Sequence, residues 1–330
     1  MILFIYPSFS SFVRNDYEIL KKYDQVKRHH YVQGKSLFRH ISSQVKLLFW
    51  LLQHIWSSDK IYCWFADYHS FLPALLAKIL GKECYVVLGG YDVTYIPEYD
   101  YGSFKNPLRA FHARSTMRLA TLNLAVSNYV REQASLKVPS AKIITIFNGI
   151  SIPNSKLNYS EKEDIILTVG TANSFQRIKL KGFDFFCQVA SLLSGYQFII
   201  IGVGEEGQKY LKEKPENVEI WNVMEPNKLS RFYKTAKVYC QFSKIESFGL
   251  AMVEAMAYGC IPVATNVGAL PEIIGKTGFI LDTPDIKKAA TLIEKALHTS
   301  EPYSVDARKR VEELFSIEQR EKEIIETLHL

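Results

Sequence analysis

The chain has 330 residues, of which 48% are hydrophobic and 22% are charged, as is typical of a soluble globular protein. Its length suits two domains or one large domain. Five cysteines, an odd number without CxxC spacing, argue against a disulfide framework or a structural zinc site and favour the reducing cytoplasm. The first residues, MILFIY, form an apolar run without a basic leader, so no signal peptide is expected.

Charge is distributed unevenly between the two halves. Residues 1–150 hold 18 Lys and Arg against 10 Asp and Glu, a net charge of +8. Residues 151–330 hold 22 against 24, a net charge of −2. The basic half suggests an anionic partner, such as a membrane surface, a phosphorylated acceptor or nucleic acid, or simply a generally basic surface. Nucleic acid is the weakest of these, because no motif interleaves aromatic and basic residues.

Short apolar runs rich in strand-forming residues alternate with segments of helical length along the whole chain. We expect strands at 2–6, 26–32, 60–65, 84–88, 122–126, 142–147, 164–170, 197–202, 217–221, 237–242, 261–264 and 278–281. Strand–helix–strand alternation with continuously apolar strands predicts parallel sheets covered by helices on both faces.

The polar stretch 151–164 separates the first six of these strands from the last six and predicts a linker. We therefore expect two doubly wound α/β domains, 1–150 and 151–330. Ligands of such sheets bind at the carboxyl ends of the strands, so two facing sheets would form a cleft. A charged helix is expected over about 303–329. It could return to the first domain and pack against it.

The segment 36–60 has an apolar stripe at helical spacing. Its longest apolar run, LLFWLL, is far shorter than the ~20 residues that span a bilayer. The stripe suits the core face of a buried helix. It also suits a helix at the inner face of a membrane, with Lys35, Arg39 and Lys46 at the lipid headgroups.

Glu254 lies in the second turn of an apolar helix that we expect to start near Ser247–Phe248. Its neighbours three and four positions away are apolar or aromatic, and none of them is basic. A carboxylate on such a face is costly unless something satisfies it. We expect a ligand with paired hydroxyls, such as a ribose; a partly exposed edge or a distant basic residue are the alternatives.

Glu246 lies ahead of the same helix. It could close a capping box with Ser243, although the apolar helix starts later than such a box requires. An open helix start at Phe248–Leu250 would bind an anion. Two hydroxyl-binding carboxylates then flank an anion site along ~12 Å of chain, which suits a sugar, a diphosphate and a ribose.

A second candidate anion site follows the strand at 164–170. Arg177, Lys179 and Lys181 cluster there, and no acid lies between Asp164 and Asp184. This is the carboxyl end of a strand, where a phosphate would gain charge-assisted hydrogen bonds. A solvated basic loop is the alternative.

Several blocks together resemble the GT-B fold retaining glycosyltransferases, in particular glycosyltransferase family 4. The main block is SKIESFGLAMVEAMAYGCIPVATNVGALPEIIG, whose Glu246 and Glu254 match the E-x7-E motif. The blocks TVGTANSFQRIKLKGFD, IIIGVGEEG and IITIFNGI are similar to others of that family and stand in the usual order. The resemblance covers most of the chain and is strongest from 142 to 282.

The resemblance implies a role for each matching residue in binding a nucleotide diphosphate sugar. Glu246 would hold hydroxyls of the donor sugar and Glu254 the ribose. Arg177 and Lys181 would hold the diphosphate. Backbone amides at Phe248, Gly249 and Leu250 would assist them, and the turn at Asn222–Val223 would meet the base.

The first domain departs from the family pattern at two places. The loop after the first strand lacks the usual Gly-Gly pair, and Ser10 and Ser11 are the candidates to replace it near the diphosphate. Tyr91 and Asp92 stand where many members carry a histidine. Asp92 is a candidate for a polar role near the reacting sugar, or else a turn residue after Gly-Gly.

The function implied is metal-independent transfer of a hexose to a cell-surface glycan or lipid-linked acceptor, with retention of configuration. The chain has no Asp-x-Asp metal motif, and the basic groups would stabilise the leaving diphosphate. The alternatives are an inactive GT-B module that supports a partner glycosyltransferase, a nucleotide-sugar epimerase, and an anion binder.

Overall fold

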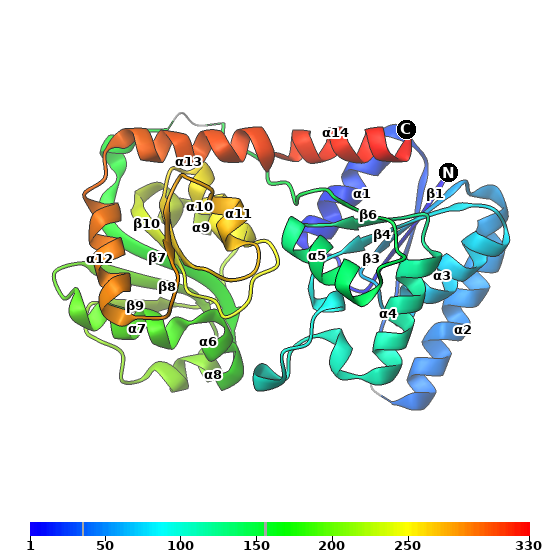
Figure 1. Ribbon diagram of the computed structural model, residues 1–330, viewed down its shortest axis with the longest axis horizontal. Coiled ribbons are helices and arrows are strands. Elements are labelled where there is room, and N and C mark those ends of the chain that lie inside the picture. Colours follow the sequence, from blue (N-terminus) through cyan, green and yellow to red (C-terminus); the bar gives the residue numbers. More distant parts are fainter. Residues whose placement is uncertain (35, 155–156) are drawn as a thin grey trace. The chain divides into compact units, whose positions relative to one another are not determined.

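The computed structural model describes residues 1–34, 36–154 and 157–330, which divide into two compact units. The first unit comprises residues 1–149 and 317–330, and the second comprises residues 150–316. Lys35, one of the predicted headgroup ligands, lies outside the described residues. The two units are described separately (Figure 1).

The first unit is built on a six-stranded parallel sheet in the order β2-β1-β3-β4-β5-β6. Its strands are β1 Ile2–Tyr6, β2 Val26–His30, β3 Lys60–Trp64, β4 Glu83–Leu88, β5 Leu122–Ala125 and β6 Ile143–Thr145. Its helices are α1 Ser11–Tyr23, α2 Leu37–His54, α3 Tyr68–Ile79, α4 Pro107–Leu119, α5 Asn128–Lys137 and α14 Ile317–Leu328, with short 3-10 turns η1 Ile55–Ser57, η2 Tyr91–Val93, η3 Pro97–Tyr99 and η4 Ser103–Lys105.

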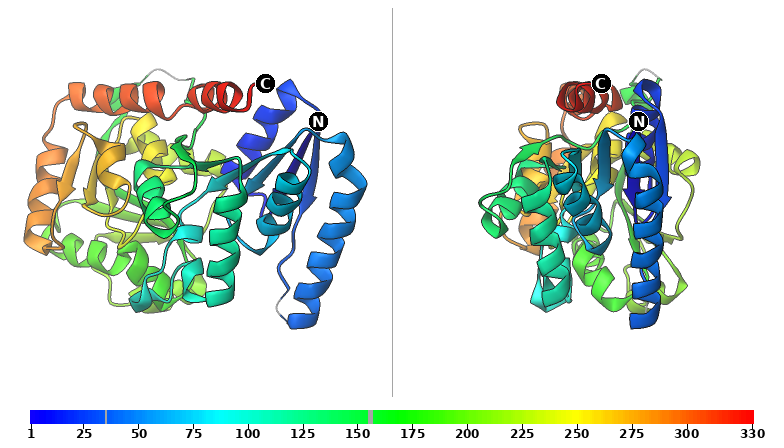
Figure 2. Two further views of the ribbon diagram at one scale, coloured as in Figure 1. Left: turned by 45° about the vertical axis from the view of Figure 1, so that its right-hand side comes forward. Right: turned by 90° about the vertical axis from the view of Figure 1, so that its right-hand side faces the viewer.

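Helices cover both faces of this sheet. Right-handed crossovers place α1 on one face and α2, α3 and α4 on the other. The helix α14 returns to the first unit and packs against α1 (Figure 1). The helix α2 lies next to α3 on the outer side of the unit (Figure 2).

The second unit repeats this plan with a parallel sheet in the order β12-β11-β10-β7-β8-β9. Its strands are β7 Glu163–Ala172, β8 Gln197–Val203, β9 Val218–Trp221, β10 Ala236–Gln241, β11 Ile261–Thr265 and β12 Phe279–Leu281. Its helices are α6 Phe175–Lys181, α7 Phe183–Leu192, α8 Glu205–Gln208, α9 Pro226–Thr235, α10 Leu250–Ala257, α11 Leu270–Ile274, α12 Ile286–Leu297 and α13 Glu301–Leu314, with turns η5 Tyr159–Glu161 and η6 Lys209–Leu211.

The predicted fold class, two doubly wound α/β domains, is confirmed by these two sheets. Each of the twelve predicted ranges holds a strand whose ends differ by at most two residues. The single helix expected over 303–329 is wrong, because two helices, α13 and α14, meet at Phe315–Ser316. The Phe315 ring is buried and packs edge-on against Phe248, which fixes the chain between the two helices.

A buried ion pair attaches α14 to the first unit. The Arg320 guanidinium donates from Nε and Nη2 to the two carboxylate oxygens of Asp16, at 2.6 and 2.7 Å. Its Nη1 donates to the carbonyl oxygens of Ile146 and Phe147, at 3.1 and 2.7 Å. Both charged side chains are almost fully buried, so each depends on the other to offset its lost hydration.

We predict that Arg320→Met lowers the free energy of unfolding by about 3–5 kcal/mol, because it leaves the Asp16 carboxylate buried and unpaired. Urea unfolding followed by circular dichroism measures the loss. Glu321→Gln is the matched control on the same helix. It removes an exposed ion pair to Lys22 and should cost less than about 1 kcal/mol. Equal losses in the two variants would contradict this account.

Candidate active site

The central feature of the second unit is a loop, 242–249, that follows β10 and leads into α10. It lies against the end of α6, where the backbone N–H of Lys244 donates to the carbonyl of Leu180. Gly182 permits this approach: its φ is +71°, and a Cβ there would lie 2.0 Å from the carbonyl oxygen of Phe242. The N–H of Ala269 holds the loop from the other side by donating to the carbonyl of Glu246.

This packing brings Lys181 and Glu246 together at the carboxyl edge of the sheet. The Lys181 Nζ lies 2.9 Å from Glu246 Oε2, and both side chains are partly exposed. Gln241 Nε2 lies 3.5 Å from the same carboxylate oxygen and donates at 2.7 Å to the Ser243 hydroxyl. The capping-box alternative for Ser243 and Glu246 is wrong, because α10 begins only at Leu250.

The basic cluster of α6 divides into residues with different partners. Lys181 faces Glu246, whereas Lys179 is paired with Asp184, at 2.6 Å. Arg177 lies on the same helix, one turn before Lys181, and its side chain is exposed. Arg177 and Lys181 therefore share a helix face, four positions apart, as a joint anion site requires.

The start of α10 differs from the predicted start near Ser247–Phe248. Gly249 is the N-cap, with a φ of +91°, a left-handed conformation that favours glycine and ends the loop. Phe248 is buried, so its backbone and not its ring can serve a ligand. Among the described residues no side chain caps this helix end, which leaves Gly249 and Leu250 at an N-terminus that attracts anions.

Glu254 has a protein partner, contrary to expectation. The Tyr233 hydroxyl, from α9, donates to Glu254 Oε2 at 3.1 Å, and the Tyr233 ring stacks on Tyr258. Burial raises the pKa of Glu254, and the hydrogen bond from Tyr233 offsets part of that rise. One tyrosine hydroxyl satisfies one acceptor position of a carboxylate that has about four, so Glu254 can still accept from a ligand hydroxyl.

Asn222 and Val223 line a hollow of about 390 Å³ after β9. Trp221 and Arg231 are also in its wall, with the guanidinium over the indole ring at 5.6 Å from its centroid. Gln208 Nε2 donates to the Asn222 side-chain oxygen at 3.0 Å. A flat aromatic base would fit such a wall of planar groups.

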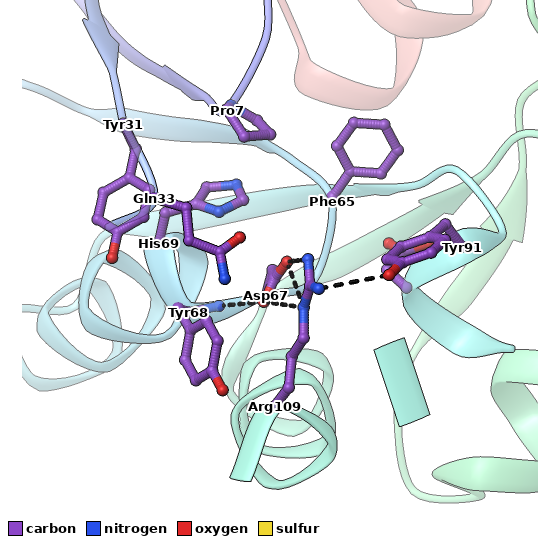
Figure 3. A pocket seen from close by; sticks show the side chains of 10 residues that line it. Pro7, Tyr31, Gln33, Phe65, Asp67, Tyr68, His69, Tyr91 and Arg109 are labelled. Carbon is purple, nitrogen blue, oxygen red and sulfur yellow. Dashed lines mark hydrogen bonds and ion pairs between the residues drawn. The ribbon is translucent and has the colours of Figure 1, made fainter. Parts of the chain in front are cut away.

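The first unit carries a separate cavity of about 190 Å³ at the carboxyl ends of β1, β3 and β4 (Figure 3). Its centre is an ion pair in which Arg109 donates to both carboxylate oxygens of Asp67. The guanidinium also lies over the Tyr91 ring, 5.2 Å from its centroid. The wall also includes Pro7, Tyr31, Gln33, Phe65, Tyr68, His69 and Asp92.

Two titratable groups of this cavity, Tyr31 and His69, are held in defined states. Burial raises the pKa of Tyr31 to about 12, so its hydroxyl keeps its proton. Burial lowers the pKa of His69, and its Nε2 donates to the carbonyl of Trp64 at 2.7 Å. A neutral His69 with a proton on Nε2 has an unprotonated Nδ1, which can accept a hydrogen bond.

Sequence reasoning missed Asp67 and Arg109. Asp67 follows β3 and caps α3 with its side chain, so its position just beyond a strand was an available signal. Arg109 lies 42 positions further on, and nothing in the sequence pairs the two.

Asp92 lines the same cavity, but its carboxylate oxygens serve the backbone. Oδ2 accepts from the N–H of Ala66 at 2.9 Å and Oδ1 from that of Gly90 at 2.8 Å. Asp92 thus ties the loop after β3 to the loop after β4, and its part near a reacting sugar stays a prediction. Ser10 and Ser11 stand at the start of α1, where the buried Ser10 hydroxyl has no hydrogen-bond partner within the described part of the chain.

Comparison with known proteins establishes the family. Residues 154–313 match the family model described as Glycosyl transferases group 1. An uncharacterized 41.2 kDa protein in the cps region of Klebsiella pneumoniae is 30% identical over 246 residues, which are 68% of this chain and 67% of that protein. Sulfoquinovosyl transferase SQD2 of Arabidopsis thaliana is 32% identical over 255 residues, 72% of this chain but 49% of that protein.

The solved structures agree on the fold. Anabaena Alr3699/HepE in complex with UDP and glucose superposes with a TM-score of 0.78 at 18% identity, covering 100% of this chain and 99% of that one. The fold is therefore of the GT-B type. The chain belongs to the glycosyl transferases of group 1.

We predict a pH-dependent contribution of Asp92 to stability. Burial raises its pKa from 3.8 to about 6. Below about pH 3 the carboxyl group is protonated in the folded and unfolded chain alike. As the pH rises towards 6 the unfolded chain ionises first, so folding loses about 3 kcal/mol across this window.

Urea unfolding from about pH 3 to 7 tests this prediction. Asp92→Asn should remove that part of the pH dependence, whereas Asp100→Asn, at an exposed carboxylate, should keep the wild-type profile. The same pH dependence in Asp92→Asn and wild type would show that Asp92 ionises as freely in the folded state as in the unfolded chain.

Proposed function

We propose that this protein is a retaining glycosyltransferase that moves a hexose from a nucleoside diphosphate sugar to a hydroxyl of a cell-surface glycan or lipid-linked acceptor. The observation that carries the proposal is the Lys181–Glu246 ion pair beside the open start of α10. Two similar proteins support the proposal. SQD2 is a sulfoquinovosyl transferase, and the Anabaena protein was solved in complex with UDP and glucose.

In the proposed complex the donor extends along the carboxyl edge of the second sheet. Glu246 accepts hydrogen bonds from sugar hydroxyls. The diphosphate lies between Arg177, Lys181 and the backbone amides at Phe248, Gly249 and Leu250. Glu254 accepts from the ribose, and the base lies in the hollow at Asn222–Val223. This order follows the family E-x7-E motif, Glu246 to Glu254.

In the proposed reaction the bond between the anomeric carbon and the diphosphate oxygen breaks, and the acceptor oxygen bonds to that carbon on the same face. The acceptor proton passes to the departing phosphate oxygen, so charge and atoms balance. The growing negative charge on the diphosphate is stabilised by Lys181, Arg177 and the helix start, which are in place before the reaction begins. In other enzymes a divalent metal ion can stabilise this charge; here the proposed stabilising groups are basic side chains and backbone amides.

The acceptor is proposed to bind in the cavity around Asp67 and Arg109 in the first unit. That cavity combines an aromatic wall with carboxylate, guanidinium and hydroxyl groups that can exchange hydrogen bonds with a polyol. Asp92 is proposed to act there as a positioning residue, because it fixes the loops that carry Asp67 and Tyr91.

We predict that Lys181→Met lowers kcat by about 10²–10³-fold, the range for loss of one preorganised donor to a developing anion. Lys179→Met is the matched control, because it removes a lysine of the same helix that pairs with Asp184. It should keep kcat within about threefold. Turnover of a nucleotide sugar by the intact protein, with the melting temperature checked in parallel, measures both.

Three other outcomes of that assay would overturn the proposal. If Lys181→Met keeps wild-type turnover, the assignment of the site is wrong. If the wild type converts the donor into an epimer without acceptor, the protein is an epimerase. If wild type binds nucleotide without any turnover, the chain is a binding module.

We predict that Glu254→Gln raises the Kd for a nucleoside diphosphate about 10–100-fold, because a hydrogen bond to a charged group contributes about 1.5–3 kcal/mol. UDP is the first probe, followed by other nucleoside diphosphates, in calorimetric titrations. Since burial raises the pKa of Glu254, acidification protonates it and wild-type affinity should fall as the pH is lowered. The Glu254→Gln variant should lack this fall.

Tyr233→Phe distinguishes a ligand contact from a structural pair. It removes the protein donor to Glu254 but keeps the carboxylate, so it should change the Kd by less than tenfold. If Glu254 and Tyr233 form only a structural pair, both variants will lower the melting temperature and neither will change the Kd.

A further inference from the structure

The helix α2 and the turn after it expose a continuous stripe of large apolar side chains. Phe38, Phe49 and Trp56 are 81%, 63% and 69% exposed. We call this set the stripe. Its members, all exposed, are Phe38, Ile41, Val45, Phe49, Leu52 and Trp56. At about 100° per residue these positions fall within an arc of about 80° and run for about 27 Å along the helix.

The stripe is not the face that packs on the sheet. Leu47 and Leu51 of α2 and Ile55 directly after it are fully buried. At about 100° per residue the centre of this buried face lies about 120° around the helix from the centre of the stripe. The helix therefore has one buried apolar face and a second that is exposed among the described residues. Figure 2 shows α2 on the outer side of the first unit. Exposed apolar patches of this kind mark contact surfaces.

The chain segment that carries the stripe has charges of one sign only, between Asp24 and Asp59. Residues 25–58 contain no Asp or Glu, but they contain five Lys and Arg. Arg39 and Lys46 are exposed on α2, and helical spacing puts both on the same flank of the stripe. An exposed apolar stripe with basic residues on its flank and no acid on α2 itself matches a surface that is apolar inside and anionic at its edge.

We propose that α2 lies in the interface of an anionic lipid bilayer, with the stripe in the acyl boundary and Arg39 and Lys46 at the headgroups. Within the described residues, none of the helices combines the length and hydropathy needed to cross a bilayer. An interfacial position suits α2, because one side of the helix is exposed while another is buried in the first unit.

A second copy of the chain is a poorer occupant. Pairing two α2 helices through the stripe would bring Arg39 and Lys46 of both copies to one seam, and no carboxylate on either helix could offset their repulsion. Anionic lipid supplies the missing negative charge. This membrane proposal is independent of the proposed function, because it uses neither the cavities nor the ion pairs of the candidate active site.

Flotation of the full-length protein with vesicles tests the proposal. Wild type should bind vesicles of phosphatidylcholine with 30% phosphatidylglycerol, bind pure phosphatidylcholine much more weakly, and lose affinity as salt is raised. The double variant Phe49→Ser, Trp56→Ser should bind at least tenfold more weakly. Lys46→Gln should weaken binding about fivefold, the effect of one basic residue near such a surface.

The matched control removes equally exposed apolar side chains elsewhere in the first unit. Phe111 on α4 and Leu136 on α5 are 57% and 75% exposed, and Phe111→Ser, Leu136→Ser should bind vesicles as wild type does. If wild type binds neither vesicle, or if the α2 variant binds like wild type, the proposal is wrong. If sedimentation instead shows a dimer that the α2 variant abolishes, the stripe is an interface between copies.

Discussion

The direction of the strands is the constraint on which the rest of the second unit depends. Because β7 and β10 are parallel neighbours in the sheet, the segments that follow them emerge side by side at one edge. The segment after β7 carries Lys181, and the segment after β10 carries Glu246. Two side chains 65 positions apart in the chain therefore meet at 2.9 Å. The same constraint in the first unit, where β3 and β4 are neighbours, places Asp67 and Asp92 at one cavity.

Close backbone packing converts this coarse placement into a defined geometry. The end of α6 can approach the loop after β10 only because Gly182 has no side chain. The hydrogen bonds of Lys244 to Leu180 and of Ala269 to Glu246 then hold that loop on two sides. A charge held in this way is in position before a ligand arrives, so little reorganisation energy is spent when the ligand's charge develops.

The parts of the structure that sequence predicts are those encoded locally. Apolar runs and the residues at their ends indicate the strands, the sheet class and the edge at which Lys181 and Glu246 lie. Partners that come from distant segments leave no such pattern. Tyr233 is 21 positions from Glu254, Arg109 is 42 from Asp67, and Arg320 is 304 from Asp16. The start of α10 differs from the predicted Ser247–Phe248 for a related reason, because the left-handed conformation of Gly249 depends on the packing of the loop before it.

The helix α2 shows where periodicity alone stops being informative. A spacing of three and four residues states which side chains share a face, but not whether protein or another medium covers that face. In α2 two such faces exist, and the sheet covers only the one with Leu47, Leu51 and Ile55. The charge pattern carries the remaining information. A solvated helix face usually mixes both signs, whereas the 34 residues from 25 to 58 hold basic residues and no acid. A helix that is apolar on two sides and basic between them is unsuited to water, and its composition suits a boundary between acyl chains and anionic headgroups.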